Sequence, residues 1–496
     1  MFRRTETQRS LFEAGALMPE EKREACRKSW AGPFREKALP ILMKREEDFA
    51  ALFDPEEGRP NRSAALVVGV LLLKEMSDLT DEEALGALKF DVRWWYGFDL
   101  EVEDTQTCQK TLHNFRGRLM KEDKSRLVFQ GLTDELISAL GIDTSKQRLD
   151  STHILSNIAV LSRLGTFCET IRIFLCALKK THSNIYETLP AGIVRRHGEK
   201  SEYGDARQTD RHRRLSVVAR DTYRLVERFK GHPAIRSSEA YRLLERLFQE
   251  RCEINVQAED PKEDDDDRGE GAVPVKLKEA GDVKSDSLQT PHDPDVTYSG
   301  HKGQGYEVQI AETAQDKDIP KDQKNSVQLI TEVHVTPSAH NDARSTIPTI
   351  EALEEAGHRP VTLLADTSYS GAENAAKSAE KGVNLLAPCP AKGKPDPQQV
   401  YPAPAPQCPK TKPEAGVWLK QQEAQPEFKK KYALRSGIEA TNSELKRGSG
   451  LGELRVRGGK RVELAVYFKV AGCNLKRALR YWLSASAMGN PLPTIA

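Results

Sequence analysis

Residues 432–446 read YALRSGIEATNSELK, and this stretch decides how the rest of the chain is interpreted. Within it, Tyr432, Arg435, Glu439 and Lys446 follow one another at intervals of three, four and seven residues. At about 100° per residue, the four positions fall within a stripe roughly 60° wide on one face of a helix. One carboxylate then stands among three side chains that can contact phosphate. This pattern indicates metal-assisted chemistry on a nucleic-acid backbone.

Two isolated aspartates follow strand-like segments far upstream of this helix. Asp150 lies in the segment 147–154, and Asp366 ends the largely apolar run 361–365, which is typical of a buried central strand. Carboxylates from different elements can hold two divalent cations, which clamp the attacking and leaving oxygens of a phosphoryl transfer. We therefore expect Asp150, Asp366 and Glu439 to be the catalytic residues and the metal ligands. The rival candidates for these roles are Asp143, Asp295 and Glu444.

The formal net charge of +1 conceals a basic segment near the end of the chain. Residues 431–480 contain 12 Lys and Arg against 4 Asp and Glu, whereas residues 259–270 contain eight acids against two bases. A basic cluster beside a candidate catalytic helix predicts contacts with DNA phosphates. The expected DNA-binding residues are Tyr432, Arg435, Lys446, Arg447, Arg455, Arg457, Lys460 and Arg461.

The amino-terminal residues 1–125 have apolar residues at helical spacing. Ser63 precedes an apolar run over 64–76, and Thr80 with Glu83 makes a capping box for the next helix. A third helix is expected to start near residue 104 or 105. Three short helices suit a DNA-end-binding bundle, and a plain helical support domain is the alternative.

Beyond residue 145 the pattern alternates between strands and helices, so the predicted fold class is α/β, with mixed α+β character. We expect a mixed sheet flanked by helices from residues 145–155 and 295–485, with a helical insertion over 156–256. The charged segment 257–294 is expected to be an acidic disordered loop. Nine prolines between residues 388 and 413 predict an irregular connection over 388–425, followed by one helix from about 426 to 448.

Targeting signals and metal-binding cysteine pairs are missing from the sequence. No apolar run approaches the roughly 20 residues of a membrane span, and charged residues interrupt the amino terminus where a secretory signal would need an apolar segment. The 8 cysteines form no Cys-x-x-Cys pair, so they are interpreted as reduced thiols. We expect a cytoplasmic protein that associates with the nucleoid when bound to DNA.

The spacing Tyr-x2-Arg-x3-Glu-x6-Lys resembles the signature of the DDE transposases of bacterial insertion sequences. The segments Leu149-Asp150-Ser151-Thr152 and Ala365-Asp366 resemble the first and second catalytic motifs of that family, and residues 50–120 resemble its helical amino-terminal domain. The resemblance implies an RNase H-like fold for the sheet domain.

The same resemblance implies a function. The chain would bind the terminal inverted repeats of an insertion sequence and catalyse metal-dependent DNA cleavage and strand transfer. It implies two Mg²⁺ ions, with Mn²⁺ as a substitute, held by Asp150, Asp366 and Glu439. It also implies double-stranded DNA partners, namely the terminal repeats and the target, and a homodimer in the synaptic complex. Two alternatives stay open: a catalytically inactive, element-derived DNA-binding protein, and an RNase H-like nuclease without strand transfer.

Overall fold

Capping residues expected from the sequence mark the starts of two amino-terminal helices. The computed structural model describes residues 2–4, 18–54, 56–57, 61–101, 105–198, 211–254, 275–315 and 326–487. Ser63 accepts a hydrogen bond from the Leu66 amide at the start of α5 (Ala64–Met76), and Thr80 and Glu83 form the expected reciprocal box at the start of α6 (Asp81–Phe90). The neighbouring helices are α2 (Glu20–Arg27), α3 (Ala31–Pro33), α4 (Leu39–Lys44), α7 (Val92–Phe98), α8 (Gln109–Lys121) and α9 (Leu127–Leu140).

The start of the third expected helix differs from the prediction. Helix α8 begins at Gln109, because Cys108 is still extended, with φ −105° and ψ 156°. Residue 104, one of the two expected starts, lies outside the described residues, as does the segment 58–60 that the family resemblance includes.

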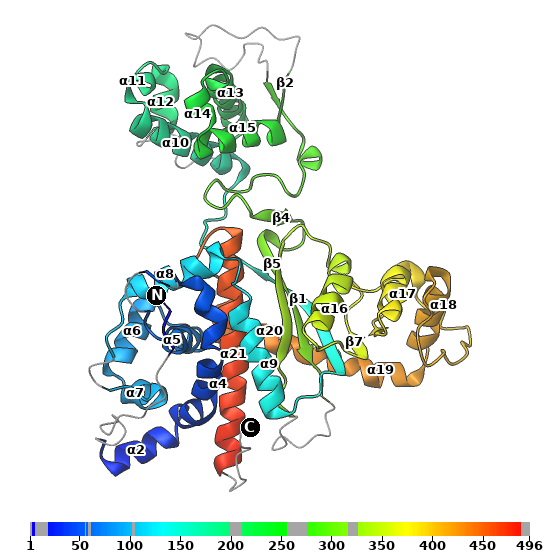
Figure 1. Ribbon diagram of the computed structural model, residues 1–496. Helices are drawn as coiled ribbons and strands as arrows, with labels where there is room; N and C mark the ends of the chain where they lie inside the picture. Colours follow the sequence, from blue (N-terminus) through cyan, green and yellow to red (C-terminus); the bar gives the residue numbers. More distant parts are fainter. Residues whose placement is uncertain are drawn as a thin grey trace.

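A mixed sheet lies beside these helices (Figure 1). Its order is β4-β5-β1-β7-β8, and β6 pairs with β5 on the edge that β4 also uses. The β1–β5 and β5–β6 pairs are antiparallel, whereas β1–β7 and β7–β8 are parallel. The mixed α+β fold class is thereby confirmed. The strands are β1 (Lys146–Ile154), β4 (Thr297–Ser299), β5 (Gly303–Thr313), β6 (Ile330–Pro337), β7 (Thr362–Leu364) and β8 (Asn384–Leu386).

The long carboxy-terminal helix packs against the amino-terminal helices. Helix α21 (Gly459–Ala487) packs against α5 and α9 and also contacts β6 (Figure 1). The contact is close, since a Cβ at Gly472 would lie 3.1 Å from the Leu72 carbonyl oxygen on α5. A single hydrophobic core therefore contains side chains of the amino-terminal helices, of β5 and β6, and of α21.

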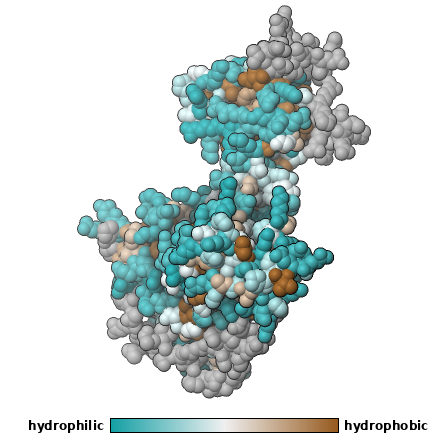
Figure 2. Space-filling view, turned by 90° about the vertical axis from the view of Figure 1, so that its right-hand side faces the viewer, coloured by the Kyte–Doolittle hydropathy of each residue, from teal (hydrophilic) through white to brown (hydrophobic). Residues whose placement is uncertain are grey.

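The segment after β1 forms a helical lobe with its own core. Figures 1 and 2 show it standing off the rest of the molecule on a narrow neck. The surface seen in Figure 2 is mostly hydrophilic, with small isolated hydrophobic patches. The lobe contains α10 (Arg163–Thr181), α11 (Ser183–Tyr186), α12 (Ala191–His197), α13 (Arg211–Phe229), α14 (Pro233–Arg236), α15 (Glu239–Arg251), β2 (Cys252–Ile254) and β3 (Val275–Leu277).

Two segments expected to be irregular hold more structure than their composition suggests. Residues 255–274, which include the whole acidic run 259–270, lie outside the described residues. Leu288 and Asp293 beyond them are fully buried, so the expected disorder over 257–294 is wrong for its last part. In the proline-rich connection, α18 (Lys412–Glu423) packs on α17 (Ala372–Glu380), because Trp418 and Leu419 are buried between them and the proline loop.

None of the described helices combines the length and the apolar character needed to cross a membrane.

Candidate active site

Strand register places the two aspartates opposite each other. The parallel strands β1 and β7 pair Arg148 with Leu364, where β7 ends. Asp366 follows two residues after the carboxyl end of β7, and Asp150 lies two residues after Arg148, midway along the longer strand β1. The Ser368 amide donates a hydrogen bond to Asp366 Oδ1 over 2.7 Å, which fixes the turn after β7.

The helix that supplies Glu439 is interrupted where it passes β1. The single helix expected over 426–448 is instead α19 (Pro426–Tyr432), a 3₁₀ turn (Ala433–Ser436) and α20 (Gly437–Gly448). Arg148 Nη1 donates a 3.0 Å hydrogen bond to the Leu434 carbonyl, and a Cβ at Gly437 would lie 2.0 Å from the same nitrogen. Glycine at position 437 therefore leaves room for Arg148. Arg148, two residues before Asp150, holds the 3₁₀ turn through the Leu434 carbonyl.

A buried ion network holds α20 and α21 against the sheet. The Arg148 guanidinium lies 2.7 Å from the fully buried Glu312 carboxylate on β5. The other oxygen of Glu312 accepts hydrogen bonds from Thr441 on α20 and Arg477 on α21, both at 2.6 Å. These two arginines lower the pKa of Glu312, although its burial acts in the opposite direction. Buried charges of this kind need full pairing, so the network fixes the position of the elements that carry the candidate site.

All three predicted carboxylates meet at one guanidinium. Arg435 Nη2 lies 3.2 Å from Asp150 Oδ1 and 3.9 Å from Asp366 Oδ2. Arg435 Nη1 lies 3.3 Å from Glu439 Oε1. Asp150 is mostly buried, Asp366 is one-third exposed, and Glu439 is 68% exposed, so the cluster opens to solvent on the Glu439 side.

The environment of Asp150 disfavours its charge. Burial raises the pKa of its carboxyl, the Arg435 guanidinium opposes this, and the neighbouring Asp366 charge raises the pKa further. Asn442 Nδ2 donates to Asp150 Oδ2 over 3.2 Å, whereas Asn442 Oδ1 is buried and has no hydrogen-bond partner in the described chain. A carboxyl in such a position gains from a further cation beside it.

The donor set fits a hard divalent metal ion. Asp150, Asp366 and Glu439 supply only oxygen ligands, the type that Mg²⁺ and Mn²⁺ prefer, and the Arg435 guanidinium shows that a positive charge is accommodated among them. As they stand, however, no three His, Cys, Asp or Glu side chains in the described ranges are close enough to hold one ion. Metal binding would require Glu439 and Arg435 to move.

The other signature residues flank the carboxylates. Tyr432 stacks on Phe428, with ring centroids 5.4 Å apart and a 9° interplanar angle, and burial raises the pKa of its hydroxyl. Lys446 is exposed at the far end of α20, and partial burial together with the charge of Lys302 lowers the pKa of its ammonium. Arg435 and Glu439 therefore lie in the acid cluster itself, whereas Lys446 lies further along α20.

The remaining predicted DNA-binding residues have different surroundings. Arg455 pairs with Asp78, with 3.1 Å between Nη1 and Oδ1, and Arg457 Nε donates to the Asn157 carbonyl. The side chains of Arg447, Lys460 and Arg461 are exposed. Arg455 thus joins the amino-terminal helices to the loop after α20, whereas the last three are free to contact a ligand.

The rival carboxylates have structural partners. Asp143 accepts from the Ser145 amide over 2.8 Å, and Asp295 accepts from the Gly459 amide over 2.8 Å at the start of α21. Glu444 pairs with Arg477 at 2.9 Å and with Arg480 at 3.3 Å. None of the three lies in the cluster around Arg435.

Sequence reasoning missed three residues beside the acids, namely Arg148, Asn442 and Lys302. Arg148 stands in an otherwise strand-like run, where a charged residue two positions before Asp150 is the available signal. Asn442 is three residues after Glu439 and so shares its helical face. Lys302 Nζ pairs with the buried Glu307 carboxylate and lies 3.3 Å from Ser151 Oγ. The contact with Ser151 joins residues about 150 positions apart, so no local pattern reveals it.

Comparison with known families identifies two segments of the chain. Residues 407–479 match the family described as Transposase DDE domain, and residues 36–118 match the family described as Transposase domain (DUF772). The first match contains Tyr432, Arg435, Glu439 and Lys446, whereas Asp150 and Asp366 lie outside both matches. No match was found among curated proteins or among solved structures.

Proposed function

We propose that this chain, a DDE transposase of the insertion-sequence type by its two family matches, binds the terminal inverted repeats of its element, cuts there and joins the ends to target DNA. The observation that carries the proposal is the convergence of Asp150, Asp366 and Glu439 on Arg435, since these carboxylates come from three segments far apart in the sequence. Acidic residues scattered over a surface would not be expected to gather around one guanidinium.

Different residues of the chain would position the metal ions and the DNA. Asp150 on β1 and Asp366, two residues after β7, would act as a pair, and Glu439 would complete the set from α20. Arg435 and Lys446 would hold phosphates on either side of the scissile bond, and Tyr432 would donate a hydrogen bond to a phosphate oxygen. When bound, two Mg²⁺ ions, or Mn²⁺ in their place, would lower the pKa of the attacking hydroxyl and neutralise charge on the leaving oxygen.

The synaptic step adds a second copy of the chain. Transposition pairs two element ends before joining, so we include a homodimer in the proposal. We infer a cytoplasmic, nucleoid-associated location from the DNA substrate alone.

Asp366→Asn tests the catalytic assignment. The variant should lose metal-dependent cleavage and joining, by at least a hundredfold, while keeping its affinity for the element ends, because the amide keeps the shape but not the charge of a metal ligand. The assay incubates labelled DNA carrying the repeats that flank the gene with Mg²⁺ or with EDTA, and resolves cleaved from joined products.

Asp396→Asn is the matched control. Its Oδ1 accepts from the amide two residues on, at 2.9 Å, as Asp366 Oδ1 does, but it lies in the proline-rich segment outside the acid cluster. Cleavage that persists in Asp366→Asn would overturn the assignment. End binding without any cutting by the wild type would favour an inactive DNA-binding protein, and cutting without joined products would favour a nuclease without strand transfer.

A further inference from the structure

The amide of Asn442 contacts the first of the three candidate carboxylates. Asn442 lies on α20, three residues after Glu439, so the two side chains belong to one face of that helix. Its Nδ2 donates a hydrogen bond to Asp150 Oδ2 over 3.2 Å, while Asp150 Oδ1 lies 3.2 Å from Arg435 Nη2. One oxygen of Asp150 therefore faces a cation, and the other is held by the Asn442 amide.

The oxygen of the same amide has no partner among the described residues. An ionised carboxylate only accepts hydrogen bonds, so the amide turns its NH₂ group to Asp150 and leaves Oδ1 for another group. Asn442 Oδ1 is shielded from solvent, yet no described residue donates a hydrogen bond to it. Oδ1 and Nδ2 are about 2.2 Å apart within an amide, so this oxygen lies no more than about 5.4 Å from Asp150 Oδ2. A buried acceptor without a donor is destabilising, so this oxygen gains from a bound cation.

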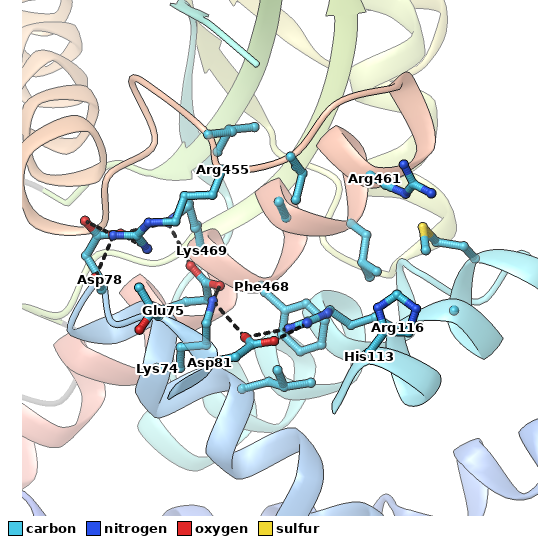
Figure 3. Close-up of a pocket in the computed structure, with 18 of the residues that line it drawn as sticks. Lys74, Glu75, Asp78, Asp81, His113, Arg116, Arg455, Arg461, Phe468 and Lys469 are labelled. Atoms are coloured by element: carbon cyan, nitrogen blue, oxygen red, sulfur yellow. Dashed lines mark hydrogen bonds and ion pairs between the residues drawn. The ribbon is translucent and has the colours of Figure 1, made fainter. Parts of the chain in front are cut away.

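Acids in another enclosed part of the molecule each have a cation beside them. A cavity of about 430 Å³ lies between α5, α6 and α8 on one side and α21 on the other (Figure 3). At the candidate active site, in contrast, one guanidinium lies 3.2–3.9 Å from three carboxylates. The acids around Arg435 therefore retain negative charge for a further cation, whereas those of the cavity do not. The ion pairs of the cavity are Glu75 with Lys469 at 2.7 Å, Asp78 with Arg455 at 3.1 Å and Asp81 with Arg116 at 2.9 Å.

The amide oxygen of asparagine has the chemistry that such a site needs. It is a hard, neutral donor of the type that Mg²⁺ and Mn²⁺ accept, and it adds no negative charge beside Asp150. Asn442 and Asp150 are already in contact, whereas Glu439 is 68% exposed and meets the other acids at Arg435. The structure as it stands thus brings two oxygen ligands, one charged and one neutral, side by side.

We propose that Asn442 is a further metal ligand of this site. Its Oδ1 binds the metal ion that Asp150 holds, and its Nδ2 keeps the Asp150 carboxylate in position. The inference rests on the proposed function and adds to it a neutral ligand from the helix that also carries Glu439.

Asn442→Leu and Asn442→Asp test the inference in the full-length, DNA-free chain, with Mn²⁺ alone as the probe. Leucine has nearly the shape of asparagine but neither polar atom, so Mn²⁺ should bind about tenfold more weakly. Aspartate keeps an oxygen at the same position and adds a charge, so Mn²⁺ should bind at least as tightly as it does to the wild type. Electron paramagnetic resonance measures the free Mn²⁺ at each total concentration and so gives the dissociation constants.

The pair of variants separates a ligand from a residue that only orients Asp150. If Asn442 acted through its amide donor alone, both variants would weaken Mn²⁺ binding, and Asn442→Asp would do so more because it places a like charge beside Asp150. That result would overturn the inference, as would equal affinities of the wild type and Asn442→Leu. If Asn442→Leu does not fold, Asn442→Asp decides alone, since weaker binding in that variant contradicts a ligand role.

Ser443→Ala is the matched control. Ser443 is the next residue on α20, is partly buried, and lies about 100° further around the helix, so its loss should leave the Mn²⁺ affinity unchanged. Thermal unfolding in EDTA checks the fold of each variant without metal. The midpoint of Asn442→Leu should stay within a few degrees of the wild type, because the change removes an unpaired buried oxygen along with a hydrogen bond.

Asp366→Asn separates this inference from the proposed function. Mn²⁺ binding that is weakened in Asp366→Asn but unchanged in Asn442→Leu would overturn the inference and leave the proposed function standing. Mn²⁺ binding that Asp366→Asn does not weaken would contradict the metal site itself, and with it both proposals.

Discussion

Three carboxylates at one point repel one another unless a cation lies between them. Here that cation is Arg435, whose two terminal nitrogens lie within 3.9 Å of Asp150, Asp366 and Glu439. The basic cluster in the sequence predicts that the same guanidinium contacts a DNA phosphate. If Arg435 contacts DNA as proposed, DNA binding would draw it away from the acids as metal ions approach them. On the proposed function, the residue would thus couple DNA binding to metal binding.

Arg435→Gln tests this coupling without DNA. Removing the guanidinium leaves the three carboxylates without a neutralising charge, so we expect Mn²⁺ to bind the DNA-free protein roughly tenfold more tightly. Titration of Mn²⁺ followed by electron paramagnetic resonance measures the free ion directly. Arg447→Gln, an exposed neighbour on α20, should leave the Mn²⁺ affinity unchanged. Equal affinities in wild type and Arg435→Gln would show that the guanidinium does not compete with metal.

At the scale of elements, the interrupted helix explains what the sequence could and could not predict. The spacing of Arg435 and Glu439 predicted that they share a face, and they lie 3.3 Å apart. Gly437 between them has a low helix propensity. The need for glycine at this position comes from Arg148, 289 positions upstream, whose guanidinium occupies the space that a side chain at position 437 would need. Local propensity marks such a position as unusual, and tertiary packing alone supplies the cause.

Gly437→Ala should destabilise the protein although alanine is the better helix former. The new Cβ would lie 2.0 Å from Arg148 Nη1 and would displace it from the Leu434 carbonyl, so we expect a loss of about 2 kcal/mol and weaker cleavage. Gly86→Ala in α6 is the control, because a Cβ at that position would have no neighbouring atom within 4 Å, and it should stabilise by roughly 0.5–1 kcal/mol. Urea unfolding measures both. A stabilised Gly437→Ala variant would show that the contact with Arg148 is not needed.

At the scale of the whole molecule, the fold class followed from the alternation of strand and helix patterns, whereas the division into folding units did not. Residues 1–125 were expected to form a domain of their own, yet α5 is buried along its whole length, and its most extensive contacts are with α21. A sequence shows which face of a helix is apolar but not which distant helix covers it. The helical lobe, in contrast, completes its core from residues 164–288 alone.

This difference in cores predicts opposite results for two deletions. Removing residues 163–289 and joining Ser162 to Thr290 through four Gly and Ser residues should leave a body that unfolds cooperatively within a few degrees of the wild-type midpoint. The two ends are close enough to join, because Thr166 Oγ1 at the start of the lobe donates to the Gln289 carbonyl over 2.9 Å. Thermal unfolding followed by circular dichroism provides the measurement.

Removing residues 1–125 is the counterpart and should abolish the cooperative transition. Helix α5 buries seven Leu and Val side chains, each worth about 1.5–3 kcal/mol when fully buried, so their loss is at least comparable to the whole stability of a typical domain, about 5–15 kcal/mol. The exposed face of α21 would then promote aggregation. A cooperative transition in this truncated chain would show that the sheet and α21 form a folding unit without the amino-terminal helices. Loss of the transition in the lobe deletion would show that the lobe stabilises the body through its neck.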